Sequence, residues 1–322
     1  QIAGFDVATV LSIYRRLLQR KGQYMTVLFA TGSQFIIGAT PERHIEIRGN
    51  ETVMIPIAGT LRKEDRATFA DRLHTFISDA KEINELFQVM DEEMKMMSLV
   101  CPSGGSIRGP LLREIGAVIH TEYELVGTRG TNSIDALRHV LHAPTVLGSP
   151  MESAARIISK YEPESRRYYS GEVGIYRQPR TDEPNGDLDT AILIRCAEIF
   201  ADGRFAVQAG GGIVRDSDPV NEARESRAKA MGILGVITGA TADHGIYLTA
   251  ELRAEIAAKL ESRNRHVAEF WMARQDGKAM ARYNCDGLRL TILNNEDDFA
   301  FMIGHLLRHM GGVVEVVDSL TY

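Results

Sequence analysis

Two pairs of glutamates give the sequence its strongest chemical signal. Glu82 and Glu85 lie three residues apart in one helical pattern, and Glu222 and Glu225 lie three apart in another. A spacing of three puts both carboxylates of a pair on one face of a helix. Two such faces brought together would make a site of hard oxygen ligands, which suits Mg²⁺ and an anionic substrate. The alternative is that both pairs belong to solvated helix faces, and spacing alone favours that alternative.

The second pair has a well-marked helix around it. Asp218 is placed to cap this helix, and Pro219 suits its first position. Lys229 follows Glu225 four residues later and would lie on the same side of the helix. Lys229 is therefore either a cation of the same site or the partner of Glu225 in an ordinary ion pair along the helix.

Glycines and an arginine indicate a candidate pocket for a carboxylate. The loop Gly210–Gly212 follows a predicted strand and could bring backbone N–H groups close to an anion. Arg195 sits in an apolar stretch, where a guanidinium needs a partner such as a bidentate substrate carboxylate. The alternatives are a mobile turn for the glycines and an internal ion pair for Arg195, and the residues alone do not decide between them.

Two further side chains could move protons. Glu42 follows Pro41 on a predicted turn after a strand, where burial would raise the pKa of its carboxyl and make it a general acid. His120 lies in an apolar stretch that we interpret as helix-like, where a single histidine is more often structural than catalytic. No cysteine lies in a Gly-x-Cys-x-Gly turn, so we expect no cysteine nucleophile.

Composition places these groups in an ordinary globular protein. The 322 residues are 44% apolar and 25% charged, with a net charge of −6. This mixture excludes a disordered or collagen-like chain, disfavours nucleic acid as a partner, and leaves no apolar run long enough to span a membrane. The three widely separated cysteines, Cys101, Cys196 and Cys285, predict a reducing, cytoplasmic compartment without a disulfide framework.

The elements that must position these groups follow from hydrophobic periodicity. Helical patterns cover residues 7–18 and 64–100, begin again at Pro219, and continue as a charged connector over 249–276. Residues 105–170 are expected to mix helices and loops. The predicted strands are 25–30, 35–37, 53–57, 173–176, 190–196 and 205–208.

The C-terminal residues predict a single βαβ unit. Residues 288–293 and 313–317 have strand patterns, and residues 297–310 between them have a helical pattern that ends at Gly311-Gly312. One such unit cannot cover a sheet by itself. We therefore expect it to open an α/β domain whose remainder is absent, in a chain that also lacks an initiator Met.

Taken in order, these segments resemble the synthase subunit of the chorismate-utilising enzymes over about residues 1–238. That family includes anthranilate, aminodeoxychorismate, isochorismate and salicylate synthases. The motifs that carry the resemblance are Gly38-Ala39-Thr40-Pro41-Glu42-Arg43, Pro56-Ile57-Ala58-Gly59-Thr60, Lys81-Glu82-x-x-Glu85-Leu86, His120, Pro144-Thr145, Gly148-Ser149-Pro150, Tyr169-Ser170-Gly171, Ala191-Ile192-Leu193-Ile194-Arg195, Gly210–Gly212, and Asp218-Pro219 through Glu222-Ala223-Arg224-Glu225 to Lys229.

One branch of the family fits best. Residues 89–97 replace the Leu-Val-Asp-Leu-Ala-Arg-Asn-Asp run of the tryptophan-pathway enzymes, and His120-Thr121-Glu122-Tyr123 resembles the fused synthase–amidotransferases of phenazine-type pathways. The resemblance implies an α+β fold with antiparallel β-sheets flanked by helices. It divides the chain into a synthase domain without its N-terminal part (1–238), a linker (239–287) and the truncated start of a class I glutamine amidotransferase domain (288–322).

The resemblance also implies roles for the acidic residues. Glu85 and Glu225 would ligate Mg²⁺, with Glu82 and Glu222 close by or binding through water. Glu42 would be the general acid that protonates the departing C4 hydroxyl of chorismate.

Further roles concern the substrate and the partners. His120 matches a family histidine near the ring that acts in pyruvate loss. Homodimerisation and ammonia from glutamine, supplied by the amidotransferase domain, are also implied. The residues implied to bind or line the substrate site are Gly59, Thr60, Thr145, Tyr169, Arg195, Gly211, Gly212 and Lys229.

The favoured function is amination of chorismate at C2 to give 2-amino-2-deoxyisochorismate. The alternatives are an anthranilate synthase, which also eliminates pyruvate, a water-using isochorismate or salicylate synthase, and a non-catalytic fragment. The family position that selects water or ammonia would lie just upstream of Gln1, so the residues of this chain leave the nucleophile open.

Overall fold

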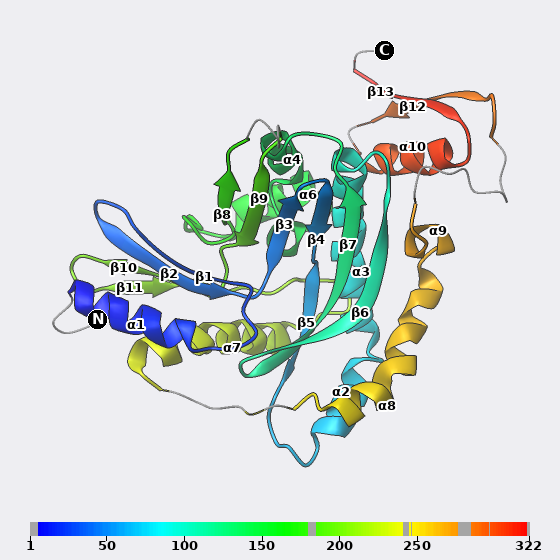
Figure 1. Cartoon of the computed structure of the whole chain (residues 1–322). Coiled ribbons are helices and arrows are strands. Elements are labelled where there is room, and N and C mark those ends of the chain that lie inside the picture. The colour runs from blue at the N-terminus through cyan, green and yellow to red at the C-terminus, as the bar shows by residue number, and fades with distance from the viewer. Residues whose placement is uncertain are drawn as a thin grey trace.

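The computed structural model describes residues 6–179, 185–240, 245, 247–275, 285–295 and 297–320 (Figure 1). The helices are α1 (Val7–Leu18), α2 (Phe69–Phe76), α3 (Ala80–Val100), α4 (Ser133–Val140), α5 (Pro144–Leu147), α6 (Met151–Tyr161), α7 (Pro219–Thr238), α8 (Ala250–Glu261), α9 (Glu269–Met272) and α10 (Phe299–His309). The strands are β1 (Met25–Ala30), β2 (Gln34–Thr40), β3 (Arg43–Arg48), β4 (Glu51–Met54), β5 (Ile57–Arg62), β6 (Gly105–Ile115), β7 (Val118–Thr128), β8 (Glu172–Arg177), β9 (Asp187–Ile192), β10 (Cys196–Phe200), β11 (Phe205–Val207), β12 (Arg289–Asn294) and β13 (Val313–Asp318).

Two antiparallel sheets form the body of the protein. The smaller has the strand order β1-β2-β10-β11, and the larger has the order β5-β7-β4-β3-β9-β8 with β6 paired to β7. The chain passes from one sheet to the other twice, between β2 and β3 and between β9 and β10. Side chains in these two crossings therefore meet where the sheets adjoin.

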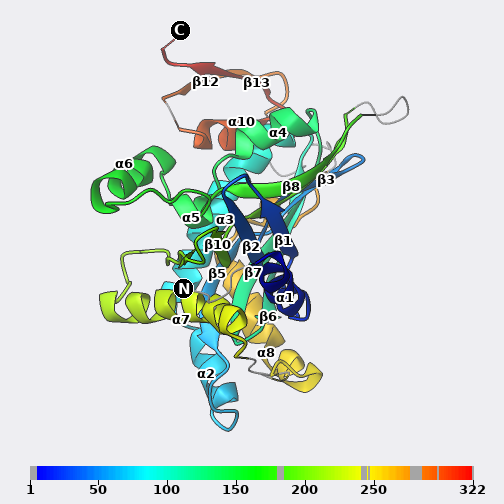
Figure 2. The same cartoon turned by 90° about the vertical axis from the view of Figure 1, so that its left-hand side faces the viewer.

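Helices cover the two sheets separately. The apolar faces of α1 and α7 pack on the smaller sheet through residues such as Ile13, Leu17 and Ile233. The long helix α3 packs on the larger sheet through Leu86 and Met90, and runs behind β7 in Figure 1. The turn from Figure 1 to Figure 2 brings the α1 and α7 side toward the viewer. The two helices that carry the glutamate pairs thus approach the junction from different sheets.

Local sequence explains where these two helices begin. The Asp79 carboxylate accepts hydrogen bonds from the backbone N–H groups of Lys81 and Glu82 at the start of α3. At the start of α7, Asp218 accepts from the N–H of Asn221, and Pro219 takes the first helical position. The predicted start of the helix at Pro219 is confirmed.

The C-terminal residues form the predicted βαβ unit. Strands β12 and β13 pair in parallel, in register from Arg289↔Val313 to Asn294↔Asp318, and α10 connects them. Helix α10 packs against α3, and the unit lies at the C-terminal end of that helix in Figure 1.

The segment 105–170 corrects the sequence-based expectation. Its first part is a long hairpin of β6 and β7, not a mixture of helices and loops, and His120 lies on β7 rather than in a helix. Residues 118–123 are buried on both faces of the sheet although His120, Thr121 and Glu122 are polar, so the run lacks the alternation of a half-exposed strand. Strand β3 also was not predicted, and of β5 and β10 only the first residue of each lay in a predicted strand.

Two smaller points concern the rest of the chain. Predicted strand 190–196 breaks after Ile192, so Arg195 lies in the crossing to β10. No helix in the described ranges is long and apolar enough to cross a membrane.

Candidate active site

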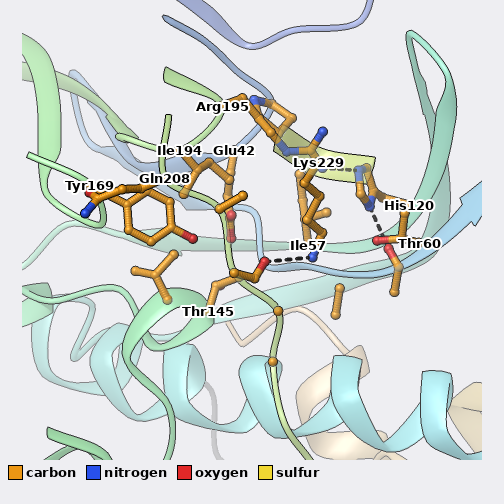
Figure 3. A pocket seen from close by; sticks show the side chains of 18 of the residues that line it. Glu42, Ile57, Thr60, His120, Thr145, Tyr169, Ile194, Arg195, Gln208 and Lys229 are labelled. Atoms are coloured by element: carbon orange, nitrogen blue, oxygen red, sulfur yellow. Dashed lines mark hydrogen bonds between the residues drawn. The ribbon is translucent and has the colours of Figure 1, made fainter. Parts of the chain in front are cut away.

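A cavity of about 560 Å³ opens where the two sheets adjoin. It is lined from both crossings, from β5 and β7, from α3 and α7, and from the glycine loop before α7 (Figure 3). The sequence-predicted residues that line it are Glu42, Gly59, Thr60, Glu85, His120, Thr145, Tyr169, Arg195, Gly211, Gly212 and Lys229. The structure therefore gathers into one cavity residues that are spread over nearly 190 positions of the chain.

Three of the four glutamates converge on the ammonium group of Lys81. Its Nζ lies 2.8 Å from Glu85 Oε2, 3.2 Å from Glu82 Oε1 and 3.4 Å from Glu222 Oε1. Burial disfavours the charge on Lys81, but the carboxylates outweigh it and raise the pKa of the lysine. Helices α3 and α7 thus share one acidic cluster, with Lys81 as its internal cation.

Glu225 completes this cluster on the side of β5. Its Oε1 accepts a hydrogen bond from Thr60 at 2.8 Å and lies 2.7 Å from Lys229 Nζ. Burial raises the pKa of Glu225, but Lys229 and Thr60 outweigh burial, so the pKa lies below the usual value. The ordinary ion pair considered for Lys229 is present, although Lys229 also lines the cavity.

The alternative of solvated helix faces is wrong for these glutamates. Their side chains are only 8–17% exposed, from Glu222 at the low end to Glu225 at the high end. Burial raises the pKa of Glu82 to about 7, although Lys81 opposes the shift. Buried carboxylates need cations, and one lysine is shared by three of them here.

The donor chemistry of the cluster fits Mg²⁺. Four carboxylates offer the hard oxygen ligands that this ion takes, and Glu82 Oε2 is buried without a hydrogen-bond partner. Among the described residues, no group of three or more His, Cys, Asp or Glu side chains is arranged to hold a metal ion, and Lys81 Nζ lies 2.8 Å from Glu85 Oε2. The ligand roles of these glutamates therefore stay predictions.

The glycine loop approaches the cluster closely. A Cβ at Gly212 would lie 3.3 Å from Glu85 Oε1, and one at Gly211 would lie 3.2 Å from Glu222 Oε2. Gly59 has φ +71°, and a Cβ there would run into Glu82 Oε2. Any side chain at these positions would press on the carboxylates, so backbone alone forms this wall of the cavity.

Glu42 is a buried acid at the cavity wall. It is 2% exposed, and its Oε1 has no hydrogen-bond partner. Burial raises the pKa of Glu42 to about 7, and contacts with Thr145 and the backbone of Ile57 oppose this shift. The carboxyl therefore holds its proton over much of the range up to neutral pH, as a general acid must.

His120 is held as a neutral imidazole. Its Nδ1 lies 2.6 Å from the carbonyl oxygen of Gly59, which can only accept, so Nδ1 carries the proton. Burial, with Arg195 nearby, lowers the pKa of His120 to about 3. The other nitrogen, Nε2, accepts a hydrogen bond from the Arg195 guanidinium at 3.5 Å, which disfavours protonation of the imidazole.

Arg195 brings a buried positive charge to the cavity. Within the described part of the chain, no carboxylate lies within ion-pair distance of its guanidinium, so the internal ion pair considered for it is absent. Burial lowers the pKa of Arg195 to about 10, which leaves it charged at neutral pH. Tyr169 lies across the cavity, where a Cβ on Gly210 would be 3.2 Å from its hydroxyl (Figure 3).

Some lining residues were not predicted from the sequence. Arg166 lines the cavity and donates hydrogen bonds to both carboxylate oxygens of Glu162 at 2.6 and 2.8 Å. It also donates to the carbonyl oxygen of Val146 at 2.6 Å. The i,i+4 spacing of Glu162 and Arg166 could have indicated their pairing. Gln208 gave no local signal of a site, because only the tertiary fold brings it to the cavity.

Comparison with known proteins agrees with this arrangement. The family model described as "chorismate binding enzyme" matches residues 3–235. The chain is 41% identical over 319 residues to a phenazine-specific anthranilate synthase of Pseudomonas chlororaphis, covering 98% of this chain and 49% of that protein. It is 33% identical over 232 residues to anthranilate synthase component 1 of Cereibacter sphaeroides, covering 69% and 44%. The chain thus spans about half the length of these relatives.

Solved structures share the fold. Anthranilate synthase component I from Streptococcus pneumoniae matches with a TM-score of 0.58 and 30% identity, over 69% of this chain and 48% of that one. A putative 2,3-dihydroxybenzoate-specific isochorismate synthase from Bacillus anthracis matches with a TM-score of 0.62 and 24% identity, over 73% and 62%. The expected fold of antiparallel sheets flanked by helices is confirmed.

Proposed function

Since the chain belongs to the family of chorismate binding enzymes, we propose that it aminates chorismate at C2 with loss of the C4 hydroxyl. The product would be 2-amino-2-deoxyisochorismate. The relatives named as anthranilate synthases support an aminating reaction, and the name of the phenazine-specific relative supports the phenazine branch without choosing between this product and anthranilate.

The observation that carries the proposal is the protonated Glu42 at the wall of a cation-rich cavity. Hydroxide is a poor leaving group, and a neutral carboxylic acid beside the C4 oxygen lets it depart as water. With a pKa of about 7, Glu42 has a proton to give and a driving force for giving it near neutral pH. Ammonia adds at C2 while the ring double bonds shift and the protonated C4 oxygen leaves.

Other lining residues would hold the substrate dianion. Arg195 offers a guanidinium without a carboxylate partner among the described residues, and the Tyr169 hydroxyl faces the same cavity. Lys229 and the backbone of Gly211 and Gly212 lie beside the acidic cluster. Charged donors on both sides would fix the two carboxylates of chorismate and so orient C2 and C4.

Mg²⁺ is proposed as the cofactor of the acidic cluster. Glu85 and Glu225 would hold it, with Glu82 and Glu222 close by. When bound, the ion would neutralise and orient a substrate carboxylate. Lys81 must then release Glu85, because its ammonium group now lies 2.8 Å from that carboxylate.

The ammonia source is also part of the proposal. The unit β12–α10–β13 would begin a class I glutamine amidotransferase domain, and the relatives that match 98% of this chain are about twice its length. Its helix α10 packs against α3, which carries Glu82 and Glu85 at its other end. The boundaries at 238 and 288, the cytoplasmic location and the homodimer stay predictions.

Anthranilate synthesis is the second candidate, and His120 is the observation that favours it. Elimination of pyruvate requires removal of the C2 proton, and His120 lines the cavity as an unprotonated imidazole, although its low pKa makes it a weak base. The same cavity would thus serve either product, and retention of the enolpyruvyl group separates them.

The test is product analysis by mass spectrometry. The protein is incubated with chorismate, Mg²⁺ and an ammonium salt, which makes a glutaminase unnecessary. An aminated product that keeps the enolpyruvyl group supports the proposal, and its loss as pyruvate supports anthranilate synthesis. Isochorismate or salicylate would indicate water as the nucleophile. Failure of a well-folded sample to bind chorismate and Mg²⁺ by calorimetry would support a non-catalytic fragment.

A further inference from the structure

Strained backbone gathers around the residues that line the cavity. Among the described residues, four that are not glycine have a positive φ, and three of these are Arg167 (+54°), Ser170 (+70°) and Arg195 (+52°). Residues with a Cβ rarely adopt this left-handed conformation, because the Cβ comes too close to a carbonyl oxygen. It persists only where surrounding contacts hold it. The turn 165–170, which carries Tyr169 into the cavity, must therefore be held by specific contacts.

Backbone hydrogen bonds join this turn to the crossing that carries Arg195. The N–H of Ser170 donates to the carbonyl oxygen of Leu193 at 3.1 Å, and the N–H of Leu193 donates to that of Gly171 at 2.8 Å. Arg195 follows two residues after Leu193. The strained positions thus belong to one hydrogen-bonded unit that presents both Tyr169 and Arg195 to the cavity.

Two adjacent arginines anchor the turn to different parts of the fold. The guanidinium of Arg166 is bound by Glu162, just after α6. The guanidinium of Arg167 reaches the smaller sheet, where its Nη2 donates to Gln34 Oε1 at 2.8 Å and lies 3.0 Å from Glu198 Oε2. The turn is therefore held on one side by the helical layer and on the other by strands β2 and β10.

The anchor for Arg167 is buried in the smaller sheet. Gln34 and Glu198 are both buried, and Gln34 Nε2 donates to Glu198 Oε2 at 3.0 Å. The Arg167 guanidinium also lies over the ring of Phe200, with its Cζ 4.9 Å from the ring centroid. A buried carboxylate needs a cation, and Arg167 supplies one to Glu198. The sheet thus offers Arg167 an amide, a carboxylate and an aromatic face.

Tyr169 is the residue of the turn whose position matters for a ligand. Tyr169 and His120 approach the cavity from opposite sides (Figure 3). The Tyr169 hydroxyl lies against the glycine loop, where a Cβ on Gly210 would be 3.2 Å away. This hydroxyl stands at the end of a long rigid ring, so a small rotation of the turn would carry it out of hydrogen-bonding range of a bound ligand.

We propose that Arg167 is a positioning residue for chorismate: its contacts with the smaller sheet hold the turn 165–170 in its left-handed conformation and keep Tyr169 in the cavity. The proposal rests on the proposed function, because it takes Tyr169 as a substrate-binding residue. Arg167 is not among the described residues that line the cavity, so it acts through the turn and not by contact with substrate. Without this tether, the strain at Arg167 and Ser170 favours a relaxed turn, and Tyr169 moves with it.

The test is the steady-state kinetics of Arg167→Met, which keeps the apolar stem and removes the guanidinium. We expect KM for chorismate to rise about tenfold while kcat stays within about twofold, because Tyr169 binds the substrate in the ground state and the transition state alike. The rise is modest because the Arg167 side chain is 44% exposed, and exposed ion pairs are weak. Arg167→Lys keeps a cation for Glu198 and should recover part of the affinity.

A double-variant cycle separates positioning from general damage to the fold. Tyr169→Phe removes the hydroxyl that Arg167 is proposed to place, so it should also raise KM. The double variant Arg167→Met/Tyr169→Phe should then have a KM close to that of the more affected single variant, because no hydroxyl is left to displace. A KM that rises by the product of the two single effects would show that Arg167 acts independently of Tyr169, which overturns the proposal.

The matched control is Arg204→Met. Arg204 also lies over the ring of Phe200, with its Cζ 5.6 Å from the centroid, but it belongs to the connection between β10 and β11 and pairs with Asp202. Its KM should equal that of the wild type. Glu198→Gln reaches the tether from the sheet and is the second variant should Arg167→Met fold poorly. It should raise KM in the same direction and enter the same cycle with Tyr169→Phe.

The outcomes separate this inference from the proposed function. An unchanged KM in Arg167→Met, or a fall in kcat without a rise in KM, would overturn the tether while the wild type still aminates chorismate. Absence of amination by the wild type would overturn the proposed function. In that case the cycle is repeated with the dissociation constant of chorismate from calorimetry, and independent effects there refute the tether as well. A wild type that binds no chorismate overturns both.

Discussion

Helix α3 carries two groups of acids with opposite surroundings. At its N-terminal end, Glu82 and Glu85 lie around Lys81 together with Glu222 from α7. Two turns further along, Glu93 is buried near Glu42 with no cation among the groups that shift its pKa. The same residue type, on the same helix, is therefore expected to do different chemistry.

The difference shows how cations assign roles to carboxyl groups. Where lysines outweigh burial, as Lys229 does at Glu225, the carboxylate stays ionised and is suited to bind a metal. Where burial outweighs cations, as at Glu42, the carboxyl stays protonated and is suited to act as an acid. Glu82 lies between the two, since burial raises its pKa to about 7 despite Lys81.

The largest expected effect comes from replacing Glu225, an ionised acid of the glutamate cluster. Glu225→Gln should lower Mg²⁺-dependent turnover by about 100-fold or more. Even residues that only support metal ligands typically change metal affinity or activity by about 10–100-fold when they are replaced. Calorimetry should show loss of Mg²⁺ binding, and the circular dichroism spectrum should stay unchanged. The control is Glu152→Gln on α6, an exposed acid outside the cavity. Unchanged turnover in Glu225→Gln would refute the metal assignment.

Replacing Glu42, the protonated acid at the cavity wall, should lower turnover nearly as much. Glu42→Gln should lose about 10²–10⁴-fold in kcat, because the C4 oxygen must then leave without a positioned proton. Chorismate and Mg²⁺ affinities should stay near those of the wild type. A variant that retains full turnover would remove Glu42 from the role of general acid.

The pH profile of the wild type sharpens the same assignment. Glu42 must be protonated to act, and its pKa is raised to about 7, so kcat should fall as pH rises through about 7. The descending limb should be absent from the residual rate of Glu42→Gln. A wild-type rate that stays flat from pH 6 to pH 9 would contradict the assignment, and stopped assays of product over that range measure it.

Burial of Glu42 should also reduce the stability of the fold. The folded pKa of about 7 lies above the reference value of 4.5, so the folded state binds more protons than the unfolded state between these values. The free energy of unfolding should therefore fall as pH rises from about 4.5 to 7. Glu42→Gln should remove this loss and so raise the free energy of unfolding by about 3 kcal/mol at pH 8, with no gain at pH 4. Urea denaturation at the two pH values measures the difference, and equal gains at both would contradict it.

Local signals allowed part of this site to be predicted. The i,i+3 glutamates and the Asp218-Pro219 helix start depend on residues a few positions apart, and both pairs lie on the expected helices. The convergence of the pairs needed a resemblance to known proteins, because 140 residues separate Glu82 from Glu222. His120 was placed on the wrong element, since a fully buried strand has no alternation to distinguish it from a helix.

The sequence also could not show which carboxyl groups lie next to a positively charged side chain. Lys81 stands beside Glu82 in the motif, but that it reaches Glu222 on α7 depends on how two helices pack. Glu93 reads as one acid in a charged run, and its proximity to Glu42 arises only when α3 covers the larger sheet. Charge, burial and partner are properties of the tertiary fold, and they decide the role of a carboxyl group.

The smallest predicted effect tests whether Lys81 competes with the metal. Lys81→Met removes the ammonium that now lies among Glu82, Glu85 and Glu222, so the cluster gains one unit of negative charge. We expect Mg²⁺ to bind about five- to tenfold more tightly in the absence of substrate, a modest change because the cluster is partly solvated. Calorimetry measures the affinity, and Lys259→Met, which removes a lysine outside the cavity, is the control. Weaker Mg²⁺ binding in Lys81→Met would instead show that the lysine holds the carboxylates in place for the metal. The glutamate cluster would then depend on Lys81 even with Mg²⁺ bound.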